Sequence, residues 1–329
     1  MNILITGGAG YIGSAAAETL IKQGHQVTVY DSLVTGHREA IPEEARFIHA
    51  DLGDEDILIR TLEDTTYDAV MHFAAFIEAG ESMKEPGRFF NNNLINSLRL
   101  IAAAVEVGIT RFVFSSSAAV YASSDEPLTE SSPLGPSNVY GQTKLMFEQA
   151  LSWYLQIHGL RYAALRYFNA AGALPGRGEA HKPESHLIPL VLQVASGQRD
   201  SISIFGTDYP TPDGTAIRDY IHIADLISAH VVALEALSQR KRMIYNLGNG
   251  MGYSVREVIN TARDITRHPI PIIESPRRQG DAPRLVASSD LIQKELGWKP
   301  KIPGLKEIIA SSWEWHSSHP QGYREAGEN

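Results

Sequence analysis

The stretch NILITGGAGYIG at residues 2–13 decides the fold of this chain. It joins a short apolar run of strand length to a cluster of glycines, and a helical pattern over residues 14–23 follows directly. A second apolar run, QVTVY at residues 26–30, ends on Asp31. Glycines permit a tight turn and let the backbone approach a pyrophosphate, which binds the N–H groups at a helix N-terminus. Strand, glycines, helix, strand and carboxylate in this order predict a Rossmann-type dinucleotide site.

Asp31 indicates which dinucleotide is bound. A carboxylate at the end of the second strand accepts a hydrogen bond from a ribose hydroxyl and repels a 2′-phosphate, so NAD is favoured over NADP. A solvated turn aspartate is the simpler alternative for this position.

The composition narrows the class of protein. With 329 residues, the chain can form one large domain or two of ordinary size. The net charge of −9 argues against nonspecific binding to nucleic acid or to an anionic membrane. The chain has no cysteine, which excludes disulfides and thiolate metal sites, and we expect no bound metal. Met1 leads directly into a strand without a basic, apolar leader, which predicts a cytoplasmic protein.

Strand and helix patterns alternate to about residue 170. Further strands are expected at 46–51, 68–75, 111–114 and 162–168, with helices at 86–107 and 139–158. Such alternation predicts an α/β fold with a Rossmann-type, doubly wound parallel sheet and with sites at the carboxyl ends of its strands. The chemically distinctive residues follow strands, as this fold requires: Gly7, Asp31, Asp51, Ala74 and Ser117.

The pattern changes beyond residue 170. Residues 173–185 are rich in Gly, Pro and charge, which predicts a long surface loop or flap over a site. We expect a dinucleotide-binding domain at 1–170 and a smaller mixed α/β substrate lobe at 171–329. Some of the second half, about 218–250, is expected to return to the first domain.

Tyr140 and Lys144 lie four residues apart in a predicted helix, so the phenol and the ammonium can point at one spot. A free tyrosine has a pKa near 10, too high for a base at neutral pH, and a fixed cation beside it lowers that value. Most such pairs are solvated helix faces. In this chain the pair follows the serine run 115–117 and a dinucleotide site, which favours a catalytic role.

Together with the motif RYFN at 166–169, these features resemble the extended short-chain dehydrogenase/reductase family, and more narrowly its UDP-glucose 4-epimerases (UDP-galactose 4-epimerases). The resemblance runs from Met1 to about Tyr323. It includes the stretches TGGAGYIGS at 6–14, HFAA at 72–75, GES at 80–82, DYPT at 208–211, RDYIH at 218–222, YNLG at 245–248 and HPQGY at 319–323.

The resemblance implies an NAD-dependent inversion of C4 in UDP-hexoses, such as UDP-galactose to UDP-glucose, through a transient 4-keto sugar. Tyr140 would take the proton of the 4-hydroxyl, and Lys144 would hold ribose hydroxyls and lower the pKa of the phenol. Ser117 would hydrogen-bond the 4-oxygen and relay its proton, although a turn serine is the simpler interpretation.

The resemblance also assigns the contacts of the two nucleotides. The implied NAD contacts are Gly7, Gly10, Tyr11, Ile12, Gly13, Asp31, Asp51, Leu52, Phe73, Ala74, Ala75, Asn93, Ser115, Tyr140, Lys144 and Tyr167. The implied contacts of the UDP-sugar are Ser117, Tyr140, Asn169, His186, Leu187, Phe205, Arg218, Tyr220, Arg278, Asp281 and Leu285. By composition alone, Phe205 is a core aromatic residue and lone arginines are usually solvated.

Two of the positions that depart from the best-studied form bear on the sugar nucleotide. His186 replaces an asparagine that meets the sugar nucleotide, and it equally suits the start of a helix. Leu285 replaces a tyrosine that narrows the hexose pocket, which predicts detectable turnover of UDP-N-acetylhexosamines. A buried Leu285 that faces the core is the alternative.

Other functions stay open beside hexose epimerisation. A UDP-pentose 4-epimerase acting on arabinose and xylose, or a UDP-N-acetylhexosamine 4-epimerase, would use the same chemistry at C4. A noncatalytic NAD-binding regulatory protein is disfavoured by the intact Ser117, Tyr140 and Lys144. A 4,6-dehydratase would need an Asp-Glu pair where this chain has Ala118 and Ala119. Helices 86–107 and 139–158 imply a homodimer by the same resemblance.

Overall fold

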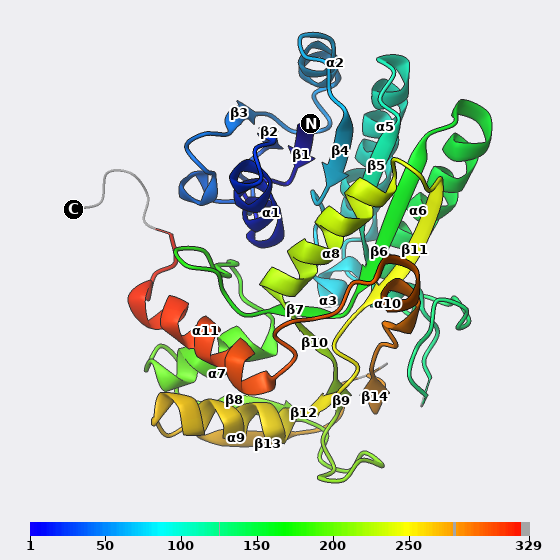
Figure 1. Cartoon of the computed structure of the whole chain (residues 1–329). Coiled ribbons are helices and arrows are strands. Elements are labelled where there is room, and N and C mark those ends of the chain that lie inside the picture. The colour runs from blue at the N-terminus through cyan, green and yellow to red at the C-terminus, as the bar shows by residue number, and fades with distance from the viewer. Residues whose placement is uncertain (125, 279–280, 324–329) are drawn as a thin grey trace.

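The computed structural model describes residues 1–124, 126–278 and 281–323, and a seven-stranded sheet is its central element (Figure 1). Every pair of neighbouring strands in this sheet is parallel. The strands, in spatial order, are β11 (Arg242–Leu247), β6 (Arg161–Tyr167), β5 (Arg111–Ser117), β4 (Ala69–His72), β1 (Asn2–Thr6), β2 (Gln26–Asp31) and β3 (Arg46–His49). The predicted doubly wound fold is confirmed, with its topological switch point between β1 and β4.

Helices cover both faces of the sheet, which explains why its strands are apolar throughout rather than alternating. On one face, α1 (Tyr11–Lys22) and α8 (Ile223–Ala236) pack in one hydrophobic cluster with residues of β1 and β2. On the other face, α2 (Glu55–Glu63), α5 (Asn96–Glu106) and α6 (Val139–His158) enclose a second cluster. Buried apolar surface on both sides therefore holds the carboxyl ends of the strands at one edge.

The turn between β1 and α1 requires its glycines. Gly7 has a φ of 72°, and a Cβ there would lie 2.5 Å from the backbone nitrogen of Ala74. A Cβ on Gly13 would collide with the carbonyl oxygen of Gly7. This close packing of the loop, α1 and β4 explains why the sequence has glycine at both positions.

The helix predicted at 86–107 is interrupted. It consists of α4 (Pro86–Phe89), a π-helical segment η2 (Phe90–Ile95) and α5. Within η2, the amide of Asn93 donates to the carbonyl of Phe76 and accepts from its backbone N–H, both at 2.8 Å. This side chain thereby fixes the loop after β4, and a π segment of this kind is frequent near functional sites.

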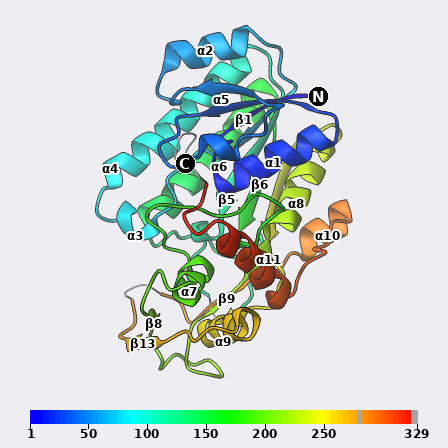
Figure 2. The same cartoon turned by 90° about the vertical axis from the view of Figure 1, so that its left-hand side faces the viewer.

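A second, smaller lobe lies below the sheet (Figure 2). Helices α7 (Leu187–Ala195), α9 (Val255–Thr266) and α11 (Leu305–Ser318) share a third hydrophobic cluster with strand β8 (Ile202–Phe205), which pairs with β13 (Ile272–Ser275). Shorter strands connect the lobe to the sheet: β7 (Asn169–Ala171) with β10 (Tyr220–His222), and β12 (Tyr253–Ser254) with β9 (Ile217–Arg218) and β14 (Arg284–Leu285).

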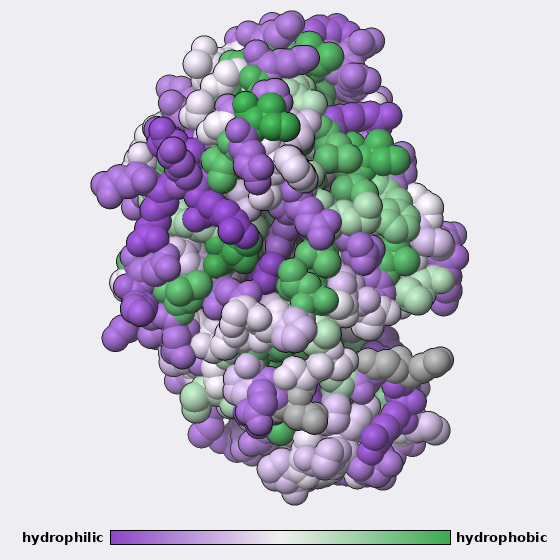
Figure 3. All heavy atoms as spheres, turned by 90° about the vertical axis from the view of Figure 1, so that its right-hand side faces the viewer, coloured by the Kyte–Doolittle hydropathy of each residue, from purple (hydrophilic) through white to green (hydrophobic). Residues whose placement is uncertain are grey.

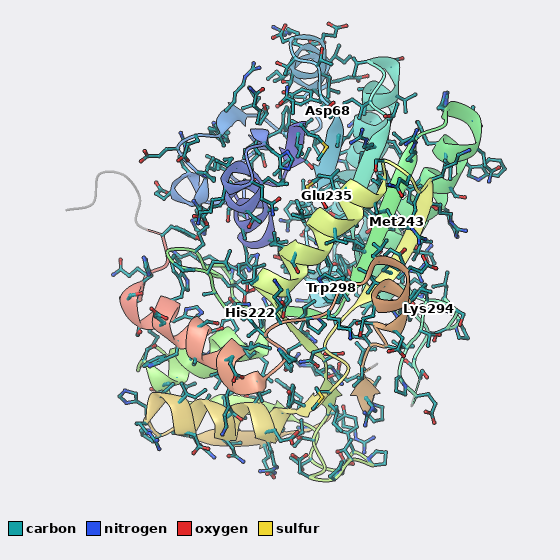
Figure 4. All side chains as sticks on the ribbon, viewed as in Figure 1. Asp68, His222, Glu235, Met243, Lys294 and Trp298 are labelled. Atoms are coloured by element: carbon teal, nitrogen blue, oxygen red, sulfur yellow. The ribbon has the colours of Figure 1, made fainter. Side chains whose placement is uncertain are left out.

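Part of the second half of the chain belongs to the central sheet and its helices. His222, labelled in Figure 4, caps α8 by accepting from the N–H of Ala224 at 3.1 Å, and β11, with the labelled Met243, forms one edge of the sheet. Trp298, also labelled, donates to Ser228 of α8 at 2.8 Å, just after α10 (Asp290–Leu296). We therefore propose a dinucleotide domain of residues 1–170 supplemented by about 218–250, with a substrate lobe from 171 onward. The end of that lobe, residues 324–329, lies outside the described residues.

Residues 172–186, here called the strap, connect β7 to α7 and cross between α1 and the smaller lobe (Figure 2). All of these residues are described, and their regular structure is limited to an isolated bridge between Leu174 and Arg177. Tyr11 of α1 donates to the carbonyl of Gly172 at 2.6 Å, and Arg177 forms an ion pair with Glu18 of α1 at 2.7 Å. The strap is thereby attached to the first helix of the dinucleotide motif.

The other side of the strap is attached to the C-terminal helix. Trp315 of α11 donates to the carbonyl of Glu179 at 3.1 Å, and the hydroxyl of Tyr323 accepts from the N–H of Gly178 at 3.2 Å.

Within the described part of the chain, none of the helices combines the length and apolar character needed to span a bilayer.

Candidate active site

A cavity of about 290 Å³, called the first cavity below, lies at the carboxyl ends of the strands. Most of the residues expected to contact NAD line it. These are Gly7, Gly10, Tyr11, Ile12, Gly13, Asp31, Asp51, Leu52, Phe73, Ala74, Ala75, Ser115, Tyr140, Lys144 and Tyr167. Ser117, Asn169 and His186, expected to contact the sugar nucleotide, line it as well.

The start of α1 is suited to an anion. Its N-cap, Gly10, offers no side-chain acceptor, and the first turn contains no acidic residue. Its N–H groups therefore lack a side-chain cap, as a helix that binds a pyrophosphate requires. A dinucleotide fits this end of the cavity.

Asp31 is buried at the end of β2 and organises the glycine turn. Its two carboxylate oxygens accept from the N–H of Ala9 at 2.9 Å and from the N–H of Leu33 at 2.8 Å. Burial raises the pKa of Asp31, and these two hydrogen bonds act in the opposite direction. The carboxylate thus has a structural role in addition to the ribose contact that we expect for it.

Asn93 does not line the first cavity, because its amide is engaged with both backbone groups of Phe76. It shapes the wall of that cavity through the loop after β4. Its neighbour Asn92 lines the cavity directly.

Tyr140, Ser117 and Lys144 meet in the first cavity. Asn138 caps α6 by accepting from the N–H of Gly141 at 2.8 Å, so that Tyr140 lies in the first helical turn. Ser117 ends β5 and hydrogen-bonds the Tyr140 phenol. Lys144 is one turn further along α6; its ammonium lies 5.8 Å from the centre of the Tyr140 ring and donates to the carbonyl of Ser115 at 2.8 Å.

Burial favours the neutral form of both Tyr140 and Lys144. Burial raises the pKa of Tyr140, and the hydrogen bond from Ser117 opposes that change. Burial lowers the pKa of Lys144 to about 7. The pKa of Tyr140 is therefore above its ordinary value, opposite to the direction expected from the sequence, because burial outweighs the hydrogen bond from Ser117.

A second cavity, of about 350 Å³, lies between the sheet edge and the smaller lobe. It shares Asn169 and His186 with the first cavity, so the two are adjacent. Its lining contains most of the residues expected to contact the sugar nucleotide: Asn169, His186, Leu187, Phe205, Arg218, Tyr220, Arg278 and Asp281.

Two arginines make this second cavity suitable for a diphosphate. Arg218 donates to the carbonyls of Ile217 and Ala282, both at 2.9 Å, which fixes its guanidinium. The guanidinium of Arg278 lies 3.9 Å from the centre of the Phe205 ring, an arrangement in which an aromatic face and a cation share one pocket. Fixed guanidinium groups are typical ligands of phosphate.

Leu285 lies outside the lining of both cavities. Its strand β14 pairs with Arg218 of β9, and its side chain packs against a buried cluster that includes Ala118 and Phe168. Ala118 follows Ser117 in the chain, and Phe168 lines the first cavity. Leu285 therefore lies behind the wall of the first cavity.

Several polar residues of the cavities were not expected from the sequence, and three of them carry ionisable side chains on or near the expected binding surfaces. Glu179 and His181 line the first cavity, and Arg199 lines the second. Glu179 and His181 lie on the strap, where no periodic pattern marks a position as inward-facing. The spacing of Glu179, His181, Glu184 and His186 within eight residues was a signal that could have found them.

A glycine turn, an acidic end of β2 and a Tyr-Lys pair on α6 together define an enzyme of the extended short-chain dehydrogenase/reductase type. A model of the NAD dependent epimerase/dehydratase family matches residues 3–248. UDP-glucose 4-epimerase of Halalkalibacterium halodurans is 49% identical over 98% of this chain and 98% of its own length.

Solved structures give the same result. A crystal structure of a UDP-glucose 4-epimerase has a TM-score of 0.96 and 48% identity, covering 99% of this chain and 100% of that one. A Stenotrophomonas maltophila UDP-glucose-4-epimerase, with bound NAD and formylated UDP-arabinopyranose, has a TM-score of 0.93 and 39% identity over 97% and 99% of the two chains. The chain therefore belongs to the NAD dependent epimerase/dehydratase family and, within it, to the UDP-glucose 4-epimerases.

Proposed function

We propose that this chain interconverts UDP-galactose and UDP-glucose by inverting C4, with Tyr140 as the base. The observation that carries the proposal is the position of Tyr140 and Ser117 in a cavity suited to a dinucleotide, directly beside a cavity that Arg218 and Arg278 line. A sugar placed between them would have its diphosphate at the arginines and its 4-hydroxyl at the phenol.

Bound NAD would supply one function: it accepts the hydride from C4 and returns it to the opposite face of the ring. Tyr140 takes the proton of the 4-hydroxyl and later returns it, while Ser117 hydrogen-bonds the same oxygen. Lys144 is held at the site through Ser115. Arg218 and Arg278 retain the nucleotide while the 4-keto sugar turns, so the intermediate stays in the cavity.

Dehydration of the sugar is disfavoured by the residues after Ser117. An Asp-Glu pair there would be needed to eliminate water, and this chain has Ala118 and Ala119, which form the short helix η3 with Val120. UDP-pentoses remain a second candidate substrate class. The formylated UDP-arabinopyranose in the Stenotrophomonas relative favours testing them.

The cofactor requirement gives the decisive assay. Because the hydride is returned, the protein should purify with a substantial fraction of NAD(H) and convert UDP-galactose to UDP-glucose without added NAD. Chromatography of the sugar nucleotides, with absorbance at the NADH band, measures both. NADH that accumulates in step with product and depends on added NAD would instead identify a dehydrogenase.

Asp31→Ala should weaken NAD binding and reduce the preference for NAD over NADP, because the carboxylate that repels a 2′-phosphate is lost. Since Asp31 also accepts from Ala9 and Leu33, Asp31→Asn serves as a control that retains one acceptor oxygen. Dissociation constants for both dinucleotides, with melting temperatures, separate the two roles. An unchanged ratio of the two constants in both variants contradicts the assignment.

Substrate breadth depends on the wall behind the site. Leu285→Tyr adds a ring and a hydroxyl against the cluster of Ala118 and Phe168, and the wall should move toward the sugar. We expect the wild type to turn over UDP-N-acetylhexosamines detectably. In Leu285→Tyr, the ratio of this activity to the activity on UDP-hexoses should fall at least about tenfold, the usual scale of steric discrimination. Equal ratios of the two activities in both proteins would show that Leu285 is not the determinant.

A homodimer in the cytoplasm is the proposed state of the protein. Trp153 and Ile157 on α6 are 62% and 68% exposed, and Ile95 of η2 is 43% exposed. Figure 3 shows apolar side chains gathered on the upper part of the face on which α6 lies. Pairing of this face with a second copy would bury them. Sedimentation should give twice the chain mass of 36.1 kDa.

A further inference from the structure

Four side chains of the strap converge on one point. The potential ligand atoms of Glu179, His181, Glu184 and His186 all lie within 4.8 Å of one another. The Nδ1 atoms of His181 and His186 lie 3.0 and 2.8 Å from Oε1 of Glu179, and Nδ1 of His186 also lies 2.8 Å from Oε1 of Glu184. The epimerisation proposed above uses none of these four residues as an acid or base.

We propose that these four residues form a binding site for a divalent transition-metal ion, Zn²⁺ in the first instance. Two imidazole nitrogens and two carboxylate oxygens are a donor set that zinc accepts, and four protein ligands are typical of structural zinc sites. The type of ion follows from the nitrogen donors, because Mg²⁺ and Ca²⁺ prefer oxygen ligands alone.

The geometry requires little adjustment. Metal–ligand bonds of about 2.0–2.1 Å place tetrahedral ligand atoms about 3.3 Å apart. The nearest pairs in the strap are at 2.8 and 3.0 Å, and the widest is at most 4.8 Å. Side-chain rotations are therefore sufficient to surround an ion, without rebuilding of the strap.

Burial and charge favour the same conclusion. The side chain of Glu179 is only 6% exposed, and its backbone carbonyl is held by Trp315, so the first ligand is already fixed in place. As metal ligands, the imidazoles would be neutral and the two carboxylates would carry two negative charges in this enclosed site, which a divalent ion balances. In the structure the carboxylate oxygens are paired with the imidazole nitrogens, and the ion would replace these contacts.

The site would fasten the strap across the first cavity. Glu179, His181 and His186 line that cavity together with residues from the start of α1. An ion joining both ends of the segment 179–186 would restrict the strap and so slow the release of a dinucleotide beneath it. This consequence rests on the proposed NAD site; the binding of the ion does not.

The experiment measures zinc binding by the full chain without a polyhistidine tag. After treatment with a chelator and dialysis, Zn²⁺ is titrated in competition with a chromogenic chelator, and bound metal is counted by mass spectrometry. We expect one Zn²⁺ per chain, with affinity at least about tenfold weaker in His181→Ala and in Glu184→Gln. His268→Ala, at an exposed histidine of the smaller lobe, is the matched control and should bind as the wild type does.

Two further measurements make the result decisive. Circular dichroism and melting temperature of Glu184→Gln establish that the strap variants are folded. Tyr140→Phe should retain zinc while losing turnover, which separates a failure of the metal site from a failure of the proposed reaction. The proposal is overturned if the wild type binds no zinc, or if it binds zinc only as tightly as His181→Ala does. The four side chains would then be held together by a histidine proton that the carboxylates share.

Discussion

Tyr140→Phe is expected to lower epimerase turnover by at least about 10²-fold, the usual scale for a positioned acid–base group. The substitution keeps the ring and its packing but removes the oxygen that Ser117 contacts. NAD content and melting temperature should change little, because the backbone N–H of residue 140 still donates to Ser82. Steady-state rates with UDP-galactose and UDP-glucose measure the loss.

A matched control lies on the same helix. Tyr154→Phe removes a phenol from α6 outside the lining of both cavities and should leave turnover near the wild-type value. Near-wild-type epimerisation by Tyr140→Phe would contradict the assignment of the base. An equal loss in both variants would point to damage of α6 rather than to lost chemistry.

Glu148→Gln is expected to lower the free energy of unfolding by about 3–5 kcal/mol, the range for breaking a buried ion pair. Glu148 of α6 and Arg166 of β6 are 4% and 3% exposed, and their charged atoms lie 2.5 Å apart. Ser116 of β5 also donates to Glu148, and Arg166 donates to Tyr121 at 3.0 Å. Neutralising the carboxylate leaves the guanidinium buried without its counter-charge.

Two comparisons test that reason. The double variant Glu148→Leu/Arg166→Met removes both charges and should be far less destabilised than Glu148→Gln, since no unpaired charge remains. Glu63→Gln, at an exposed position of α2, should stay within about 0.5 kcal/mol of the wild type. Urea unfolding measures all three. A double variant as unstable as the single one would show that packing, not the unpaired charge, dominates.

The parts of the site that could be predicted from sequence depend on contacts close along the chain. Gly7, Gly13 and Asp31 belong to one strand–turn–helix–strand unit, and Tyr140 and Lys144 share one face of one helix. Each of these relations has a fixed spacing, so the pattern alone indicates the geometry.

The remaining features depend on contacts that spacing does not encode. Asn93 turns toward the loop after β4 because a π segment interrupts its helix, and no local pattern indicated that interruption. Glu179 and His181 face the cavity because Trp315, far along the chain, holds the strap. The pKa of Tyr140 rises because of burial, which depends on the whole fold.

The strap has a thermodynamic consequence for the two nucleotides. It contributes Glu179 and His181 to the first cavity and His186 to both, in one short continuous segment. A ligand that orders this segment from one side lowers the entropic cost of ordering it from the other. Linkage then requires reciprocity: the factor by which the dinucleotide tightens binding of the sugar nucleotide equals the factor by which the sugar nucleotide tightens binding of the dinucleotide.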